Sequence, residues 1–202
     1  MFSRRYTNFW DGLFRPSKTH ILGSGEVKTL TNLVSNGNFV NTTGWTALYS
    51  SLSVADNTAT LTGDGSATSI RLRRDGLNPI NNHVYAVTIK MRTSKTASSL
   101  AVNFAQSTPY QFNPTINTWY PKTFLMSGTF ASTFTPLVIF ASAAAQSGAV
   151  VDIQYVSCVD LTAEFGAGNE LALTDYESWI NTQSNSWFNT TAEYLCNTNQ
   201  WF

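Results

Sequence analysis

The sequence predicts an all-β protein: an antiparallel β-sandwich or jelly roll with an extended N-terminal arm, a short C-terminal helix and an aromatic tail. Residues 29–160 contain many short segments that alternate apolar and polar side chains, with turn-forming residues between them and no helical periodicity. A parallel α/β fold would need crossover helices, which this stretch lacks. At 43% hydrophobic and 13% aromatic residues, the chain has enough apolar surface to bury a core.

The 202 residues divide into three segments, which suits one domain with appendages. We expect an anchoring arm over residues 1–28, the jelly roll over 29–160, and a glycine-rich turn, short helix and tail over 161–202. The 12 basic and 12 acidic residues cancel, but the arm is basic and residues 159–202 contain no Lys or Arg. The two ends are either solvated tails or complementary surfaces that meet.

The clearest strand covers residues 84–92. Its side chains alternate, so that Val87 and Ile89 face the core while Lys90 and Arg92 face the opposite side. Further strands are predicted at residues 58–62, 68–72 (with Ile70 and Leu72 inward), 100–105, 119–126, 136–141 and 150–159.

The arm presents large apolar side chains on one or two helical turns within residues 6–14, which Pro16 ends. A helix this short is marginal in water, so these side chains need a surface that covers them. That surface is either the flank of this domain or another protein, and exposed aromatic residues favour another protein. The partner-anchoring residues are Phe9, Trp10, Leu13 and Phe14.

Residues 161–202 change character after a glycine-rich turn. Thr174 and Glu177 fit a capping box, and a helix is expected from about Asp175 to Gln183 with Trp179 on its apolar face. The tail that follows is too aromatic for a disordered linker, and we expect it to pack on the sandwich or on a neighbour.

Neither a membrane span nor a secretory signal is expected. No run approaches the roughly 20 apolar residues of a membrane span, and Asn8 and Asp11 interrupt the segment after Arg4. We therefore expect a protein made in a cytoplasm, where Cys158 and Cys196 stay reduced; a bridge between them is the alternative.

Nothing in the sequence predicts catalysis. His20 and His83 have no metal-binding spacing, and no Gly-x-Ser-x-Gly elbow occurs. Glycoside hydrolysis needs two carboxylates across a sugar-sized gap, whereas the acidic residues of the sandwich lie mostly in turns, where Asp bonds backbone amides. We expect neither enzymatic activity nor a cofactor.

Saccharide binding is the stronger functional hypothesis, because aromatic rings stack on apolar sugar faces while amide and guanidinium groups bond hydroxyls. The candidate aromatic platforms are Tyr49, Tyr110, Phe112 and Tyr120, and the candidate polar partners are Arg71, Arg73, Asn103 and Gln106. Structural alternatives exist: Tyr110 and Phe112 could only pin their proline-bounded loop, and the arginines could guard a strand edge against aggregation.

Residues 32–160 resemble the jelly-roll carbohydrate-binding modules found on xylanases and related glycosidases. The opening at residues 32–45 reads as a short strand, a turn at Asn36 and Gly37, and a corner that ends at Trp45. The motifs that carry the resemblance are Asn32-Leu-Val-Ser-Asn-Gly-Asn-Phe39, Gly44-Trp45, the Tyr85–Arg92 strand, Trp119 and Val151–Ser157. The resemblance implies that Trp45 and Trp119 pack in the core.

Such modules often hold a structural calcium ion near the opening and the closing strand. Asp152 matches the acidic residue of the closing strand, whereas Val40 stands where the family commonly has Glu. The resemblance thus implies Asp152 as a calcium ligand, with a second carboxylate missing.

A second resemblance covers residues 160–170, Asp-Leu-Thr-Ala-Glu-Phe-Gly-Ala-Gly-Asn-Glu. This stretch is similar to the segment that closes sandwich domains in structural proteins of tailed bacteriophages, with Leu171 here in place of Pro. It implies a virion component of the tail, collar, fibre or capsid surface, present as a homo-oligomer or in multiple copies beside other virion proteins.

The leading hypothesis is therefore a bacteriophage virion protein that anchors by its arm and displays a jelly roll for adhesion to host glycans. Two alternatives stay open: a stand-alone carbohydrate-binding module, and a capsid decoration protein with no ligand. Neither nucleic acid nor a membrane is expected as a partner.

Overall fold

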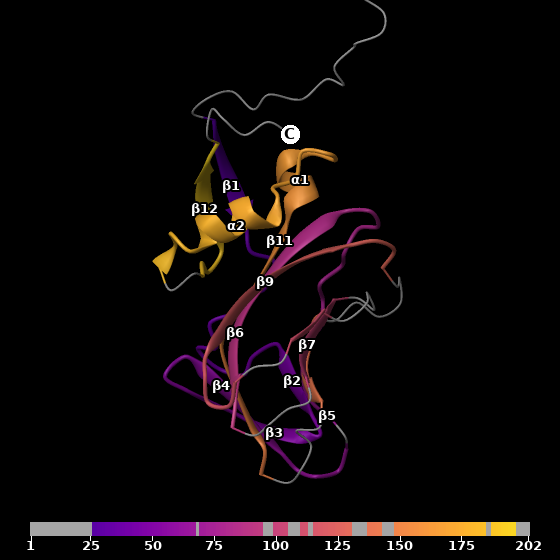
Figure 1. Cartoon of the computed structure of the whole chain (residues 1–202), viewed down its shortest axis with the longest axis vertical. Coiled ribbons are helices and arrows are strands. Elements are labelled where there is room, and N and C mark those ends of the chain that lie inside the picture. The colour runs from indigo at the N-terminus through magenta and orange to yellow at the C-terminus, as the bar shows by residue number, and fades with distance from the viewer. Residues whose placement is uncertain are drawn as a thin grey trace, which may run out of the picture.

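The computed structural model describes residues 26–67, 69–94, 99–104, 110–112, 115–130, 137–142, 148–184 and 187–196 (Figure 1). The predicted anchoring residues Phe9, Trp10, Leu13 and Phe14 lie outside these ranges, and so does Gln106.

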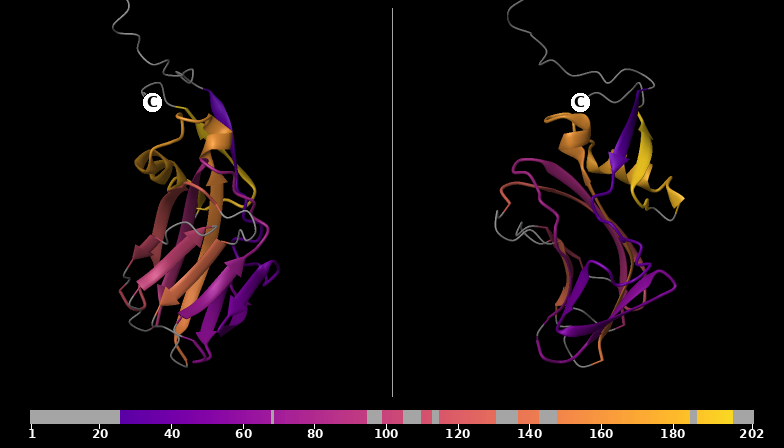
Figure 2. Two further views of the ribbon diagram at one scale, coloured as in Figure 1. Left: turned by 90° about the vertical axis from the view of Figure 1, so that its right-hand side faces the viewer. Right: turned by 180° about the vertical axis from the view of Figure 1, so that it is seen from behind.

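Two five-stranded antiparallel sheets face each other and form a sandwich. Sheet I has the order β2 (Trp45–Leu48), β5 (Ser69–Arg74), β10 (Leu137–Ser142), β7 (Ser99–Phe104) and β8 (Tyr110–Phe112). Sheet II has the order β3 (Ser50–Ala55), β4 (Thr58–Gly63), β11 (Val150–Asp160), β6 (Val84–Thr93) and β9 (Tyr120–Ser127). The left view of Figure 2 looks onto the outer side of sheet I. The predicted fold class is confirmed.

The core lies between the two sheets, where inward-facing side chains of both meet. Ile70 and Leu72 are fully buried, as predicted from their alternation with polar neighbours. The ring of Tyr85 packs edge-on against Phe104 and Phe130, with centroids 5.1 and 5.5 Å apart. Burying each of these aromatic side chains contributes roughly 1.5–3 kcal/mol to folding.

A second hydrophobic cluster lies against one end of sheet II, on its outer face (Figure 1). It is enclosed by α1 (Leu161–Phe165), α2 (Leu173–Ile180) and a ribbon of two antiparallel strands, β1 (Val27–Thr31) and β12 (Thr191–Leu195). Its aromatic members are Phe165, Tyr176, Trp179, Phe188 and Tyr194. The aromatic segment up to Cys196 therefore packs on the chain's own sandwich, one of the two predicted outcomes.

This cluster explains why β6 is buried on both faces along its first half. Val87 and Ile89 enter the sandwich core, while Ala86 and Thr88 are buried on the opposite side. Further along the strand, Lys90 and Arg92 are only half-buried, because α2 and the ribbon do not reach that far.

The opening at residues 32–45 is a loop up to Trp45, where β2 begins. The strand predicted at its start is wrong, because β1 ends at Thr31. Asn36 holds the loop: its Nδ2 donates to the carbonyls of Asn41 and Thr43 at 2.9 and 3.0 Å. The indole of Trp45 donates to the Asn36 carbonyl at 3.0 Å, and Trp45 is buried, as expected.

Asn32 connects the opening to both hydrophobic clusters. Its side-chain oxygen accepts hydrogen bonds from the backbone N–H groups of Val34 and Cys158, both at 3.0 Å. Its Nδ2 donates to the carbonyls of Phe188 and Asn189, at 2.9 and 3.2 Å. Because Asn32 is only 7% exposed, its amide holds β11 and the C-terminal segment together away from water.

The side chains of the motif at residues 160–170 form hydrogen bonds within the motif and to the start of β6. Asp160 caps α1 by accepting from the N–H of Ala163 at 2.9 Å, and its carboxylate lies 2.8 Å from Nδ1 of His83. Thr162 donates to Glu170 at 2.5 Å and accepts from the N–H of Val84 at 2.8 Å. The motif therefore fixes α1 to the start of β6.

The helix expected at Asp175–Gln183 exists as α2, but it begins at Leu173, and the predicted capping box is wrong. Ala172 occupies the N-cap and makes no side-chain capping bond. The helix is placed instead by its buried face, since Trp179 packs on Tyr176 and Phe188 with ring centroids 5.4 Å apart in both pairs.

Cys158 and Cys196 are both free and buried, which confirms the preferred prediction over a bridge. They belong to different clusters, Cys158 to the sandwich core and Cys196 to the C-terminal cluster. In the described part of the chain, neither helix has the length and apolar character needed to cross a membrane.

Candidate functional site

The outer face of sheet I brings together three of the predicted polar ligands. Arg73 of β5 and Asn103 of β7 are both register partners of Val138 on β10, so they share one row across three strands. Arg71 lies in the next row on the same face, because residues two apart on a strand point to one side. At the usual strand spacing, Arg73 and Asn103 are roughly 10 Å apart.

Tyr49 extends this face at the turn between β2 and β3. The guanidinium carbon of Arg71 lies 5.7 Å from the centre of the Tyr49 ring. Tyr49 has a φ of 59°, a left-handed conformation that is unusual for a tyrosine, and its side chain is 44% exposed. An exposed aromatic ring beside an arginine is an arrangement that can stack on a sugar and bond its hydroxyls.

The two arginines differ in what holds them. Arg73 forms an ion pair with Asp75 at 3.0 Å, which balances its charge. Arg71 donates from Nε to the hydroxyl of Ser69 at 3.2 Å. Each guanidinium group is therefore held by a residue two positions away in the sequence. Thr46 and Leu48 of β2 complete the same two rows.

The other three predicted aromatic platforms, Tyr110, Phe112 and Tyr120, lie at the β8–β9 edge of the sandwich. The hydroxyl of Tyr110 donates to the carbonyl of Leu125 at 2.6 Å, and its ring lies 5.0 Å from that of Phe124. Tyr110 therefore ties β8 to β9 across the sandwich. Phe112 is the register partner of Leu100 on β7, and its side chain lies outside the described part of the structure.

Tyr120 is also at this edge, on the first residue of β9. Its hydroxyl lies 3.4 Å from that of Thr115, a hydrogen bond that lowers the pKa of the phenol.

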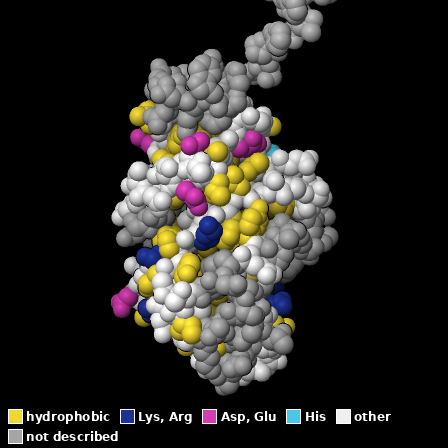
Figure 3. Space-filling model, viewed as in Figure 1, with side chains coloured by type: hydrophobic (Ala, Val, Ile, Leu, Met, Phe, Trp, Pro, Cys, Tyr) yellow, Lys and Arg dark blue, Asp and Glu magenta, His cyan; other side chains and the backbone are white. Residues whose placement is uncertain are grey.

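Figure 3 shows hydrophobic side chains gathered in a band across the middle of the face that Figure 1 views. Tyr110 and Ile116, each 42% exposed, are among the apolar residues that the protein leaves accessible. In sheet I, β10 and β7 lie between β8 and β5, so this edge is separate from the strand that carries Arg71 and Arg73.

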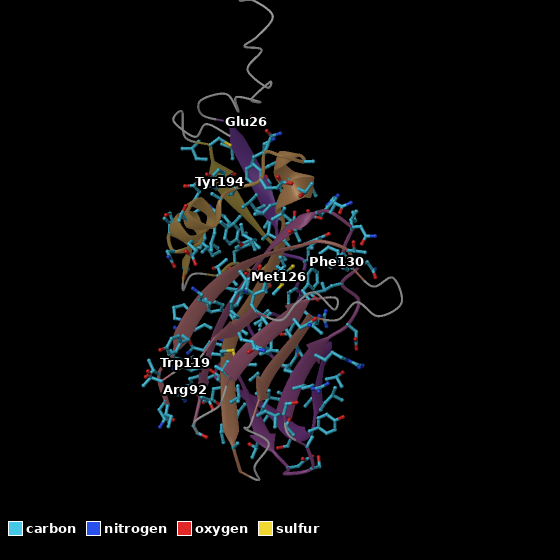
Figure 4. The ribbon with its side chains drawn as sticks, turned by 45° about the vertical axis from the view of Figure 1, so that its right-hand side comes forward. Glu26, Arg92, Trp119, Met126, Phe130 and Tyr194 are labelled. Atoms are coloured by element: carbon cyan, nitrogen blue, oxygen red, sulfur yellow. The ribbon has the colours of Figure 1, made fainter. Side chains whose placement is uncertain are left out.

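Trp119 is not in the core, contrary to the prediction. It is half-buried and lies against Arg92 and Lys90 of β6, with 4.7 and 5.7 Å between its ring centre and the two cationic groups. Figure 4 shows Trp119 and Arg92 on the outer side of sheet II, away from sheet I. The sequence held a signal for this group, since Lys90 and Arg92 alternate with buried residues, but the three were not expected to meet.

Asp152 does not fit the calcium site that the resemblance implied. Its two carboxylate oxygens accept from the Thr60 hydroxyl at 2.7 Å and from Nε of Arg92 at 2.8 Å. A cationic partner competes with a metal ion for the carboxylate, and calcium takes six to eight oxygen ligands. Within the described ranges, no three His, Cys, Asp or Glu side chains are grouped as a metal site.

Comparison with known proteins identifies the fold. No protein-family model matches the chain, and none of the curated proteins matches it. An arabinose-bound GH51 α-L-arabinofuranosidase is similar with a TM-score of 0.50 and 16% identity, over 78% of this chain and 30% of that one.

Carbohydrate-binding modules are among the similar structures as well. A CBM4 structure has a TM-score of 0.48 and 14% identity, over 63% of this chain and 99% of that chain. A family 16 module has a TM-score of 0.46 and 16% identity, over 64% and 100%. At these identities the likeness concerns the β-sandwich fold alone.

Proposed function

We propose that this chain is a non-catalytic saccharide-binding module and that the outer face of sheet I is its binding surface. The observation that carries the proposal is the shared register of Arg73 and Asn103, with Arg71 in the adjoining row and the Tyr49 ring beside it. The ring supplies a stacking surface, and the guanidinium and amide groups supply hydrogen-bond donors for sugar hydroxyls.

The arrangement favours binding over hydrolysis. A hydrolase needs a facing pair of carboxylates at the site, whereas Asp75 is engaged by Arg73 at 3.0 Å. Asp64, whose N–H donates to the carbonyl of Tyr49, accepts a hydrogen bond from the Ser66 hydroxyl at 2.6 Å. His83 is likewise engaged in the structure, by the carboxylate of Asp160 at the α1 end of sheet II. The chemistry available at the face is therefore recognition of hydroxyl groups.

Affinity electrophoresis tests the proposal. The protein is run through native gels that contain arabinoxylan, galactomannan, hydroxyethylcellulose or bacterial lipopolysaccharide, beside a gel without polysaccharide. We expect retardation in at least one gel, lost in Tyr49→Ala and Arg71→Gln and kept in the control Tyr120→Ala. If the Tyr120 variant loses retardation and the Tyr49 variant keeps it, the face of sheet I is not the site.

We further propose that the module is displayed on a bacteriophage virion, made in the host cytoplasm, and attached by the arm predicted at residues 1–28. The last two residues of that range, Val27 and Lys28, belong to β1. The sequence similarity of residues 160–170 suggests the virion. The geometry that favours attachment is the pairing of the two ends: the N–H of Cys196 donates to the carbonyl of Glu26 at 2.9 Å. Both ends of the described chain thus lie at one pole, with the sandwich extending away from it (Figure 1).

Deletion of residues 1–20 tests this second proposal. The shortened protein should fold, as judged by circular dichroism, and should be missing from purified particles. A shortened protein that is incorporated normally would exclude the arm as the anchor. Cryo-electron microscopy of the particles then distinguishes a tail or fibre position from a capsid decoration without a ligand.

A further inference from the structure

The outer face of sheet II carries a polar row that ends at an aromatic side chain. The row crosses four neighbouring strands, because Ser53 pairs with Thr60, Thr60 with Asp152, and Asp152 with Arg92. Trp119 directly precedes β9, the next strand, and stacks on Arg92. At the usual strand spacing, the row is roughly 20 Å long from β3 to β9.

Short contacts fix the charged part of this row. Asp152 accepts from the Thr60 hydroxyl on one side and from Nε of Arg92 on the other, at 2.7 and 2.8 Å. The guanidinium carbon of Arg92 is 4.7 Å from the centre of the Trp119 ring, and Nζ of Lys90 is 5.7 Å from it. The indole is thus positioned by two cations at one end of the row (Figure 4).

The row remains accessible to solvent, although hydrogen bonds and ring contacts fix several of its side chains. The side chain of Arg92 is 40% exposed, Ser53 is exposed, and Trp119 and Lys90 are half-buried. The α2 helix and the β1–β12 ribbon cover the other end of sheet II. Because Trp119 is only half-buried, part of its side chain stays accessible to a ligand at this surface.

The local charge indicates the kind of ligand. The negative charge of Asp152 balances the positive charge of Arg92, whereas no acidic side chain in the described ranges forms an ion pair with Lys90. The group therefore carries one positive charge in excess, next to a stacking ring and a line of hydroxyl groups. A carboxylated sugar has the complementary set: an apolar ring face, hydroxyls and one negative charge per residue.

We propose that this row binds a glycan that contains uronic acids. Trp119 stacks on a sugar ring, Lys90 and Arg92 attract its carboxylate, and Ser53 and Thr60 bond hydroxyls of the neighbouring units. The site lies on the opposite sheet from Tyr49 and Arg71, so it does not depend on the saccharide site proposed above.

The test compares two matched ligands by isothermal titration of the full chain. Tetragalacturonic acid is measured against its carboxyl-reduced form, galactotetraose, at the same ionic strength. We expect the acidic oligomer to bind about tenfold more tightly, a difference that corresponds to about 1.4 kcal/mol in the free energy of binding. Equal affinity for the two ligands, or binding of neither, would overturn the proposal.

Matched variants locate the binding. Lys90→Gln should remove most of the preference for the acidic oligomer. The control is Lys122→Gln, because Lys122 is the register partner of the core residue Ile89 and therefore lies on the opposite face of sheet II. This control should change the affinity less than about twofold. Trp119→Phe should weaken both oligomers, and Arg71→Gln neither. An equal loss in Lys90→Gln and Lys122→Gln would show unspecific attraction and would refute the site.

Discussion

The side-chain oxygen of Asn32 accepts a hydrogen bond from the backbone N–H of Cys158, a residue 126 positions further along the chain. The same amide donates to the carbonyls of Phe188 and Asn189. A single polar side chain thus joins the opening of the sandwich, its closing strand and the C-terminal cluster. The opening motif at residues 32–39 therefore has, at Asn32, a structural role.

Asn32→Ala should therefore be strongly destabilising. The substitution leaves the N–H of Cys158 and the carbonyl of Phe188 without these partners in a buried place, at about 1–3 kcal/mol for each unsatisfied group. We expect a loss of about 3 kcal/mol in the free energy of unfolding, measured by urea denaturation. Asn189→Ala, an exposed position that keeps its backbone carbonyl, is the control and should change stability by less than about 0.5 kcal/mol. Equal stabilities of the two variants would refute the role given to Asn32.

Gly37→Ala tests the close approach of the opening to β11. A Cβ at residue 37 would lie 2.0 Å from the carbonyl oxygen of Val156, which is backbone and cannot swing away. We expect the loop to be displaced and the melting temperature to fall by several degrees, as a loss of about 2 kcal/mol implies for a chain of this size. Asn38→Ala in the same loop is the control and should melt close to the parent protein. A Gly37→Ala protein with unchanged melting would contradict the geometry.

Trp179 and Trp119 should respond differently to the same substitution. Trp179 is 9% exposed, packs on three aromatic rings and donates its indole N–H to the carbonyl of Glu193 at 3.0 Å. Trp179→Ala should cost about 3–5 kcal/mol, as other large deletions from cores do. Trp119→Ala removes mainly contacts with two cations and should cost less than about 2 kcal/mol. Chemical denaturation of both variants measures the difference, and the reverse order would place Trp119 in the core.

The two thiols should be unreactive in the folded protein. Burial raises the pKa of both Cys158 and Cys196, so the reactive thiolate is disfavoured as well as shielded. Titration with a disulfide reagent should find neither thiol in the native protein at mildly alkaline pH and both after denaturation without reductant. Detection of no thiol after denaturation would indicate a disulfide and contradict the structure.

The sequence predicted seven of the described strands, because alternation reports directly on a sheet with one buried face, whereas β1, β2, β3, β8 and β12 were not predicted. Ile70 and Leu72 are inward for this reason, and Arg71 and Arg73 are outward together. That Asn103 joins them required the register across β10, which no local pattern contains. The placement of Tyr110 was equally out of reach, since it depends on β8 and β9 lying at the same edge of the sandwich.

The errors also have physical causes. Thr174 and Glu177 fit a capping box locally, but packing of Tyr176 and Trp179 into the cluster fixes where α2 begins. Trp119 was expected in the core because the resemblance of residues 32–160 implied that position, whereas in the structure it lies against Arg92 and Lys90 at the surface. Tertiary contacts decided both cases.

Nuclear magnetic resonance mapping tests the central proposal, saccharide binding by the outer face of sheet I, most directly. Isotope-labelled protein is titrated with a hexasaccharide fragment of whichever polysaccharide retards it most in the gels. We expect chemical-shift changes concentrated at Thr46, Leu48, Tyr49, Arg71, Arg73 and Asn103. Changes concentrated instead at Tyr110 and Tyr120 on the β8–β9 edge, or no changes at saturating saccharide, would contradict it.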